Sequence, residues 1–121
     1  MINDSPNILS AVMSNVSLSC DVMISKDCLT TILQEIINIF QNNKYADICV
    51  VELGCNSGAT SIYIQKLLHS LGLVGCFHVY DSFEGLPSIT VGKDGHNMKG
   101  AYKTTVDKFI NLFEKIIYSY L

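Results

Sequence analysis

The fold is decided by the stretch Ile48-Cys49-Val50-Val51-Glu52-Leu53-Gly54-Cys55-Asn56-Ser57-Gly58-Ala59-Thr60. It begins as a continuous apolar run rich in β-branched residues, which is typical of a strand buried on both faces of a parallel sheet. Two glycines and small polar residues follow, and a periodic apolar pattern resumes at Ala59. The stretch therefore predicts a strand, a glycine turn and a helix, the arrangement found where α/β sheets bind nucleotides.

Helical periodicity precedes this stretch. Asp4-Ser5-Pro6 predicts the start of a first helix, because a capping side chain stands before an early proline. Ser25 or Asp27 is expected to cap a second, amphipathic helix that ends at Asn42-Asn43. Its apolar residues recur at helical spacing: Leu29, Ile32, Leu33, Ile36, Ile37 and Phe40. Residues 1–43 are thus expected to be N-terminal helices.

A second strand is predicted after the glycine turn and its helix, which should stop at Gly72. The run from Cys76 to Tyr80 is short and apolar and ends in Asp81. Two strands joined by a helix predict a right-handed βαβ unit with parallel strands. Residues 82–100 predict a long loop. Thr104 or Thr105 should cap a last helix, and residues 118–121 predict the start of a third strand. The apolar side of that helix is expected to be formed by Val106, Phe109, Ile110, Phe113 and Ile117.

Size and composition indicate one globular domain over residues 1–121. The chain has 121 residues, an apolar fraction of 49% and a formal net charge of −3, so it lacks the basic balance typical of proteins that bind nucleic acid or anionic membranes. No apolar run is long enough to span a membrane, and no secretory signal is recognisable. The five cysteines are odd in number and form no Cys-x-x-Cys pair or zinc pattern. Reduced cysteines, no metal site and a cytoplasmic location are expected.

Three features should meet at one edge of the sheet: the turn from Gly54 to Gly58, the acid Glu52 near the end of the first strand, and Asp81 at the end of the second. Parallel strands end at the same edge, so Asp81 should lie beside the turn. An acid about 20 residues beyond such a turn can accept hydrogen bonds from the hydroxyls of a ribose. The pattern therefore predicts a nucleoside site.

The turn differs from the common phosphate-binding patterns. Asn56 stands where the dinucleotide fingerprint needs its middle glycine, and no Gly-Lys-Ser or Gly-Lys-Thr follows. Glu52 would repel phosphate and attract a cation, so a positively charged nucleoside such as S-adenosylmethionine fits best. The alternative for Glu52 is a buried acid that caps backbone amides. Among the histidines, His78 is expected to pack in the core, and His96 to lie in the long loop.

Two motifs carry a family resemblance. Glu52-Leu53-Gly54-Cys55-Asn56-Ser57-Gly58 resembles the first motif of class I S-adenosylmethionine-dependent methyltransferases. The run Val79-Tyr80-Asp81-Ser82-Phe83-Glu84-Gly85-Leu86-Pro87 resembles the signature of the TylF-like (macrocin O-methyltransferase) group, and the stretch from Lys99 to Thr105 is similar to that group's segment before a helix. The resemblance covers roughly residues 45 to 115. It implies a Rossmann-like parallel sheet with flanking helices, the N-terminal part of a class I methyltransferase fold.

The resemblance also implies a function: transfer of a methyl group from S-adenosylmethionine to a hydroxyl of a sugar or small metabolite. The cofactor-binding residues would be Glu52, Gly54, Cys55, Asn56, Ser57, Gly58, Asp81, Ser82 and Phe83. The metal ligands and the base of the TylF-like group lie further along than this sequence extends, so no catalytic residue is assigned. A fragment is therefore expected, which would dimerise or bind a chain that supplies the missing half.

Three alternatives stay open at the level of the sequence. The chain could be a fragment that is inactive alone, a nucleoside-binding or partner-binding remnant without turnover, or a dinucleotide-dependent oxidoreductase. Asn56 disfavours the last of these, because the dinucleotide fingerprint needs glycine at that position.

Overall fold

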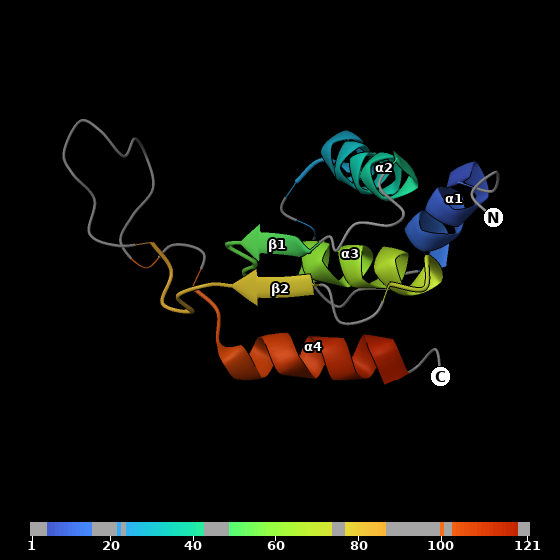
Figure 1. Ribbon diagram of the computed structural model, residues 1–121. Coiled ribbons are helices and arrows are strands. Elements are labelled where there is room, and N and C mark those ends of the chain that lie inside the picture. Colours follow the sequence, from blue (N-terminus) through green and yellow to red (C-terminus); the bar gives the residue numbers. More distant parts are fainter. Residues whose placement is uncertain are drawn as a thin grey trace, which may run out of the picture.

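The computed structural model describes residues 5–15, 22, 24–42, 49–73, 77–86, 100 and 103–118. In these ranges the chain is mixed α/β, with four helices and one two-stranded sheet (Figure 1). The elements in chain order are α1 (Ser5–Asn15), α2 (Lys26–Asn42), β1 (Val50–Leu53), α3 (Ala59–Ser70), β2 (Phe77–Tyr80) and α4 (Val106–Tyr118). The predicted order of helices and strands is therefore confirmed, whereas Cys76 and residues 87–99 lie outside the described residues.

The two strands pair in parallel, as predicted. Their register places Val50 beside Phe77 and Leu53 beside Tyr80. One further hydrogen bond continues this alignment past the strand ends, because the amide of Gly54 donates to the carbonyl of Tyr80 at 2.7 Å. Both strands thus end at the same edge, which brings the residues that follow each of them together.

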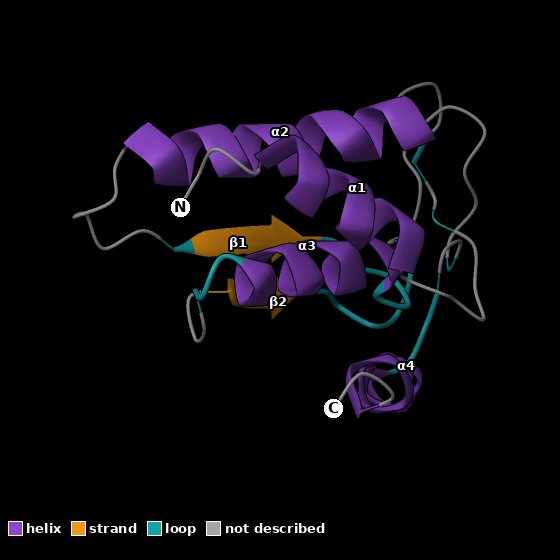
Figure 2. Cartoon of the chain, turned by 90° about the vertical axis from the view of Figure 1, so that its right-hand side faces the viewer, coloured by secondary structure: helices purple, strands orange, loops and turns teal. Residues whose placement is uncertain are grey.

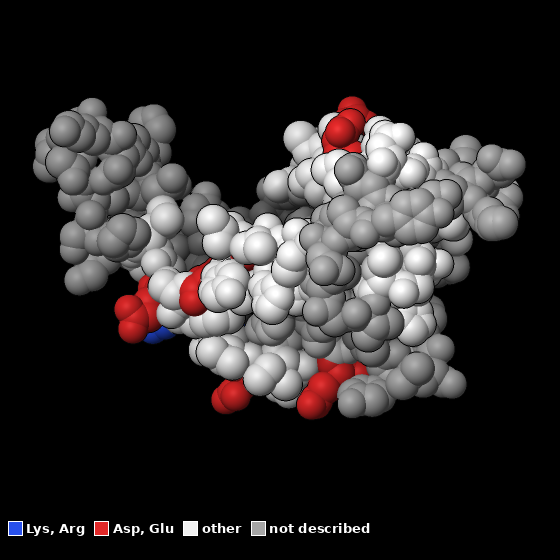
Figure 3. Space-filling model, viewed as in Figure 1, with Lys and Arg blue, Asp and Glu red and all other residues white. Residues whose placement is uncertain are grey.

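Only one face of the sheet is covered by described helices. Side chains alternate between the two faces of a strand; on the open face Val51, Leu53 and Tyr80 are 54%, 78% and 57% exposed. Figure 1 views this open face, and in Figure 3 the described surface over the strands is mostly white, with red acidic atoms where the strands end. The expectation that the first strand is buried on both faces is therefore wrong for the described chain. His78 is exposed on the same face, so its predicted place in the core is also wrong.

The main core lies between the first three helices and the covered face of the sheet. Figure 2 shows α2 lying across α1 and α3, on the side away from α4. The buried side chains of this cluster are Val12, Leu29, Leu33, Ile36, Ile37, Ile64, Leu67 and Leu68. Val50 and Phe77 pack against them from the sheet. The predicted apolar face of α2 is confirmed except at Ile32, which is 37% exposed. Ser25 is the cap of α2, since its hydroxyl accepts a hydrogen bond from the amide of Cys28 at 3.1 Å.

The last helix packs through part of the predicted face, together with Leu112, which was not predicted to pack. Thr105 caps α4, because its hydroxyl accepts the amide of Lys108 at 3.1 Å. Leu112 is buried and Phe109 and Phe113 are half-buried, whereas Val106 and Ile110 are 48% and 45% exposed. Tyr118 belongs to this helix, which corrects the prediction of a strand beginning there; residues 119–121 lie outside the described residues.

Candidate functional site

Asp81 lies beside the glycine turn, as the sequence predicted. Its Oδ2 accepts a hydrogen bond from the backbone amide of Asn56 at 2.8 Å, and its Oδ1 accepts one from the amide of Phe83 at 2.8 Å. One carboxylate therefore joins the turn after β1 to the segment after β2. This contact is a direct result of parallel pairing, which brings both strand ends to one edge.

The backbone at this edge is left-handed at several positions. Gly54 and Gly58 have φ of 83° and 97°, which glycine adopts without steric penalty. Asn56 has φ of 50°, a value that asparagine tolerates better than most residues. Phe83 has φ of 58°, which is unusual for an aromatic residue. The hydrogen bonds to Asp81 hold both non-glycine residues in these conformations.

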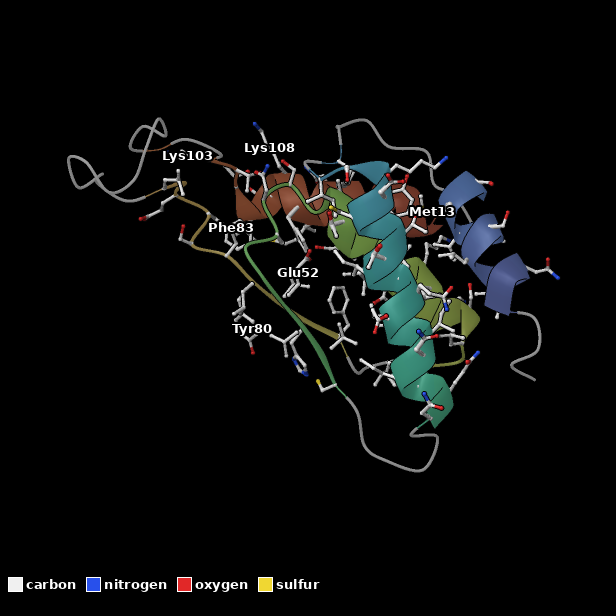
Figure 4. All side chains as sticks on the ribbon, turned by 90° about the horizontal axis from the view of Figure 1, so that it is seen from above. Met13, Glu52, Tyr80, Phe83, Lys103 and Lys108 are labelled. Atoms are coloured by element: carbon white, nitrogen blue, oxygen red, sulfur yellow. The ribbon has the colours of Figure 1, made fainter. Side chains whose placement is uncertain are left out.

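Glu52 reaches the edge from inside the covered face of the sheet. In Figure 4 its side chain lies on the helix side of β1, whereas Tyr80 points away on the open side. Its Oε1 accepts a hydrogen bond from the hydroxyl of Ser61, which is buried in the first turn of α3. Burial raises the pKa of Glu52, the bond from Ser61 lowers it, and the negative charge of Asp81 raises it further. Glu52 thus ties β1 to α3 through a hydroxyl rather than through backbone amides.

Ser61 was not predicted as a site residue. It occupies the inward side of α3 together with Ile64 and Leu68. A polar residue at such a position needs a hydrogen-bond partner, and Glu52 is the nearest acid before it in the sequence. That pairing of an inward serine with an inward acid was the available signal.

Cys55 contributes its backbone and its shape to the turn rather than a reactive thiol. Its side chain is buried, and its Sγ contacts the carbonyl of Asn56 at 3.4 Å. Burial, followed by the charges of Asp81 and Glu52, raises the pKa of this thiol to about 11. The thiol is therefore protonated at neutral pH and is a poor nucleophile.

The second half of the turn, Ser57 and Gly58, is covered by α4 and by Thr104, which precedes that helix. A Cβ atom on Gly58 would lie 2.7 Å from Cδ2 of Phe109. The hydroxyls of Ser57 and Thr104 are 3.2 Å apart and share a hydrogen bond. The ring of Phe83 meets that of Phe109 edge to face, with centroids 6.2 Å apart. Three predicted cofactor residues thus contact this region, in which Thr104 and Phe109 had been expected only as a cap and a core residue.

The first half of the turn is open. A Cβ atom on Gly54 would meet no other atom within 4 Å. Ser82 is exposed next to Asp81, and its hydroxyl accepts the amide of Glu84 at 3.2 Å, which shapes the segment after β2. The open part of the site is therefore made by Gly54, Asn56, Asp81 and Ser82, with Glu52 and Cys55 beneath it.

Chemically, this edge combines two carboxylates with an accessible backbone turn. It suits a ligand with hydroxyl donors and positive charge, because carboxylates accept hydrogen bonds and attract cations. Within the described ranges no three His, Cys, Asp or Glu residues are grouped so that they could hold a metal ion. His96, which was predicted to lie in the long loop, is outside these ranges. None of the described helices is long and apolar enough to cross a membrane.

Comparison with protein-family models, curated proteins and solved structures found no match to this chain.

Proposed function

We propose that this chain binds S-adenosylmethionine at the edge formed by the glycine turn and Asp81, as the donor-binding part of a class I O-methyltransferase. The acceptor would be a hydroxyl of a sugar or another small metabolite. The observation that carries the proposal is the position of the Asp81 carboxylate, held 2.8 Å from the amide of Asn56 in the turn.

The residues at this edge fit the chemical groups of the cofactor. A carboxylate offers about four lone-pair sites, and the two backbone amides bonded to Asp81 use only part of that capacity. The remaining capacity suits a ribose diol, which has two neighbouring donors. Open space at Gly54 admits a ligand to the backbone of the turn.

The charges at the site favour a cationic ligand. Glu52 and Asp81 are close enough for the charge of Asp81 to raise the pKa of Glu52. Two neighbouring carboxylates attract a sulfonium and an ammonium group and repel phosphate. The electrostatics therefore support a nucleoside with positive charge over a dinucleotide.

In this proposal the chain positions the cofactor and leaves the acceptor to other groups. When bound, S-adenosylmethionine supplies an electrophilic methyl group on its sulfonium. Asp81 would orient the ribose, and the backbone from Gly54 to Asn56 would hold the methionine part, with Glu52 beneath its positive charges. Fixed orientation of the reacting groups contributes much of the rate in such transfers. No residue of this chain is assigned as the base that removes the acceptor's proton.

The fold supports the same proposal at a coarser level. A parallel β1–α3–β2 unit with helices on one face is what the first part of a Rossmann-like sheet would contain. The acceptor is proposed to be a hydroxyl of a small molecule because the run from Asp81 to Pro87 resembles the signature of the TylF-like group. A cytoplasmic location and assembly with a second chain, identical or complementary, belong to this proposal.

Calorimetric titration tests the proposed ligand directly. We expect S-adenosylmethionine and S-adenosylhomocysteine to bind and NAD not to bind. Asp81→Asn should weaken S-adenosylhomocysteine binding by about tenfold or more, since a charged hydrogen-bond acceptor is lost. Glu35→Gln, which removes an exposed acid from α2, is the matched control and should bind normally.

Two outcomes would contradict the assignment. Binding of NAD alone would favour the oxidoreductase, and a folded chain that binds neither S-adenosyl compound would remove the proposed ligand. A methyl-transfer assay with small hydroxyl acceptors then separates an enzyme from a binder, since binding without turnover favours the non-catalytic alternative.

A further inference from the structure

The start of α4 occupies the space directly above the second half of the glycine turn. The hypothetical Cβ of Gly58 lies 2.7 Å from Cδ2 and 2.8 Å from Cε2 of Phe109, so the aromatic ring touches the backbone there. Thr104 is buried, and its hydroxyl bonds to Ser57. The ring of Phe109 is stacked on Phe113, with centroids 4.6 Å apart, and meets Phe83 at its other side. The ring is therefore held in place by contacts on several sides.

The same ring lies over the beginning of α3. Gly58 is the N-cap of α3, and no side chain caps that end of the helix. In dinucleotide sites the phosphates bind where a helix begins after a glycine turn. Here Phe109 fills the space above Gly58, while the space above Gly54 remains open.

We infer that Phe109 is a specificity-determining residue of the site, which excludes a phosphate group from the second half of the turn. A ligand is thereby confined to the half that contains Gly54, Asn56 and Asp81. This inference rests on the proposed nucleoside site and adds a steric cause of its selectivity to the electrostatic one. It places that cause in a side chain of α4, far along the chain from the turn.

Steric exclusion by Phe109 and repulsion by Glu52 and Asp81 should depend differently on salt concentration. Glu52 and Asp81 repel phosphate through space, and salt screens the repulsion between exposed charges. The Phe109 ring acts by occupying volume, which salt does not change. Withdrawing the ring leaves both carboxylates in place, so the contribution of the ring can be measured separately.

The experiment compares adenosine and ADP as ligands, because they differ only by the diphosphate. Their dissociation constants are measured for the native chain, Phe109→Ala and Phe109→Val at low and high salt. We expect both variants to shift the ratio of the two constants toward ADP by about fivefold, the upper end of the usual range for one charge at a helix start. Leu112→Ala removes a buried side chain from the same helix without uncovering Gly58 and should leave the ratio unchanged. Far-UV circular dichroism identifies which variants are folded, and Phe109→Val, which loses less packing, serves if Phe109→Ala unfolds.

The outcomes separate this inference from the proposed function. A folded Phe109 variant whose ratio is unchanged, or which binds neither ligand, overturns the inference. A native chain that fails to bind S-adenosylhomocysteine, together with a variant that gains ADP, supports the exclusion by Phe109 and removes the proposed cofactor. If the native chain binds S-adenosylhomocysteine and the Phe109 variants bind ADP no better, the proposed cofactor is supported and the exclusion by Phe109 is wrong.

Discussion

Glu52 makes the stability of this fold depend on pH. Burial, opposed by the bond from Ser61 and assisted by the charge of Asp81, raises its pKa in the folded chain above the ordinary value of 4.5. The folded state therefore keeps the proton of Glu52 to higher pH than the unfolded state does. The stability conferred by this proton is full below the unfolded pKa and is lost as pH rises through the folded pKa.

Glu52→Gln should remove this pH dependence. Glutamine can still accept the hydrogen bond from Ser61 but carries no charge to be desolvated. We expect the variant to gain stability relative to the native chain on going from about pH 4 to about pH 7. Urea denaturation at both pH values measures the difference, with Glu35→Gln as an exposed control. A parallel pH profile for the native chain and Glu52→Gln would contradict the assignment of Glu52 as a desolvated acid.

The two glycines of the turn serve different purposes, which becomes visible when α3 and α4 are considered as packed elements. Both have positive φ, so alanine at either position carries a backbone penalty of about 1 kcal/mol. Only at Gly58 does the added methyl group collide with another element, at 2.7 Å from Phe109. Gly58 is thus a contact between α3 and α4, whereas Gly54 only bends the chain.

Gly58→Ala should therefore destabilise the protein more than Gly54→Ala. The overpacking adds about 1–3 kcal/mol to the backbone penalty. Thermal or urea unfolding of both variants gives the comparison. In a Phe109→Ala background the excess should become much smaller, because the colliding ring is gone and only Phe113, 3.3 Å from the added Cβ, stays close. If Gly58→Ala and Gly54→Ala lower the free energy of unfolding equally in the native background, α4 does not pack against Gly58.

Local patterns in the sequence were sufficient for several of these elements. The strand, the glycine turn and the helix after it follow from adjacent residues, and so does the cap at Ser25. The position of Asp81 beside the turn also followed, because parallel pairing has a fixed consequence for strand ends. The packed face of α4 followed only in part, since Phe109 and Phe113 pack but Val106 and Ile110 are exposed. Val106 and Ile110 share a helical period with Phe109 and Phe113, and periodicity alone does not tell which part of a broad apolar face meets a neighbour.

At the scale of the molecule, the described residues leave one face of the sheet open, which the sequence pattern alone did not indicate. The run Val50-Val51-Glu52-Leu53 is typical of a strand buried on both faces, yet burial depends on elements that lie elsewhere in the chain. In the described chain the helices lie on one side of the sheet, and Val51, Leu53 and Tyr80 face outward. An exposed apolar sheet face of this kind promotes self-association.

Leu53→Thr should reduce self-association without loss of stability. Threonine suits a strand and replaces an apolar group that is 78% exposed. We expect the free energy of unfolding to change by less than about 0.5 kcal/mol, while light scattering at high protein concentration decreases. Ile110→Gln on α4 is the matched control for an exposed apolar residue outside the sheet. If the control decreases scattering equally, the sheet face has no special role.

The burial of Cys55 gives the molecule a built-in reporter. Among the described cysteines, Cys28 and Cys49 are accessible, and Cys55 is hidden inside the glycine turn. A thiol reagent reaches the first two at once, but it reaches Cys55 only when the turn opens. The rate at which the reagent modifies Cys55 in the native chain therefore measures how often the turn opens. A ligand that binds over the turn should lower this rate, and no cysteine has to be introduced to observe it.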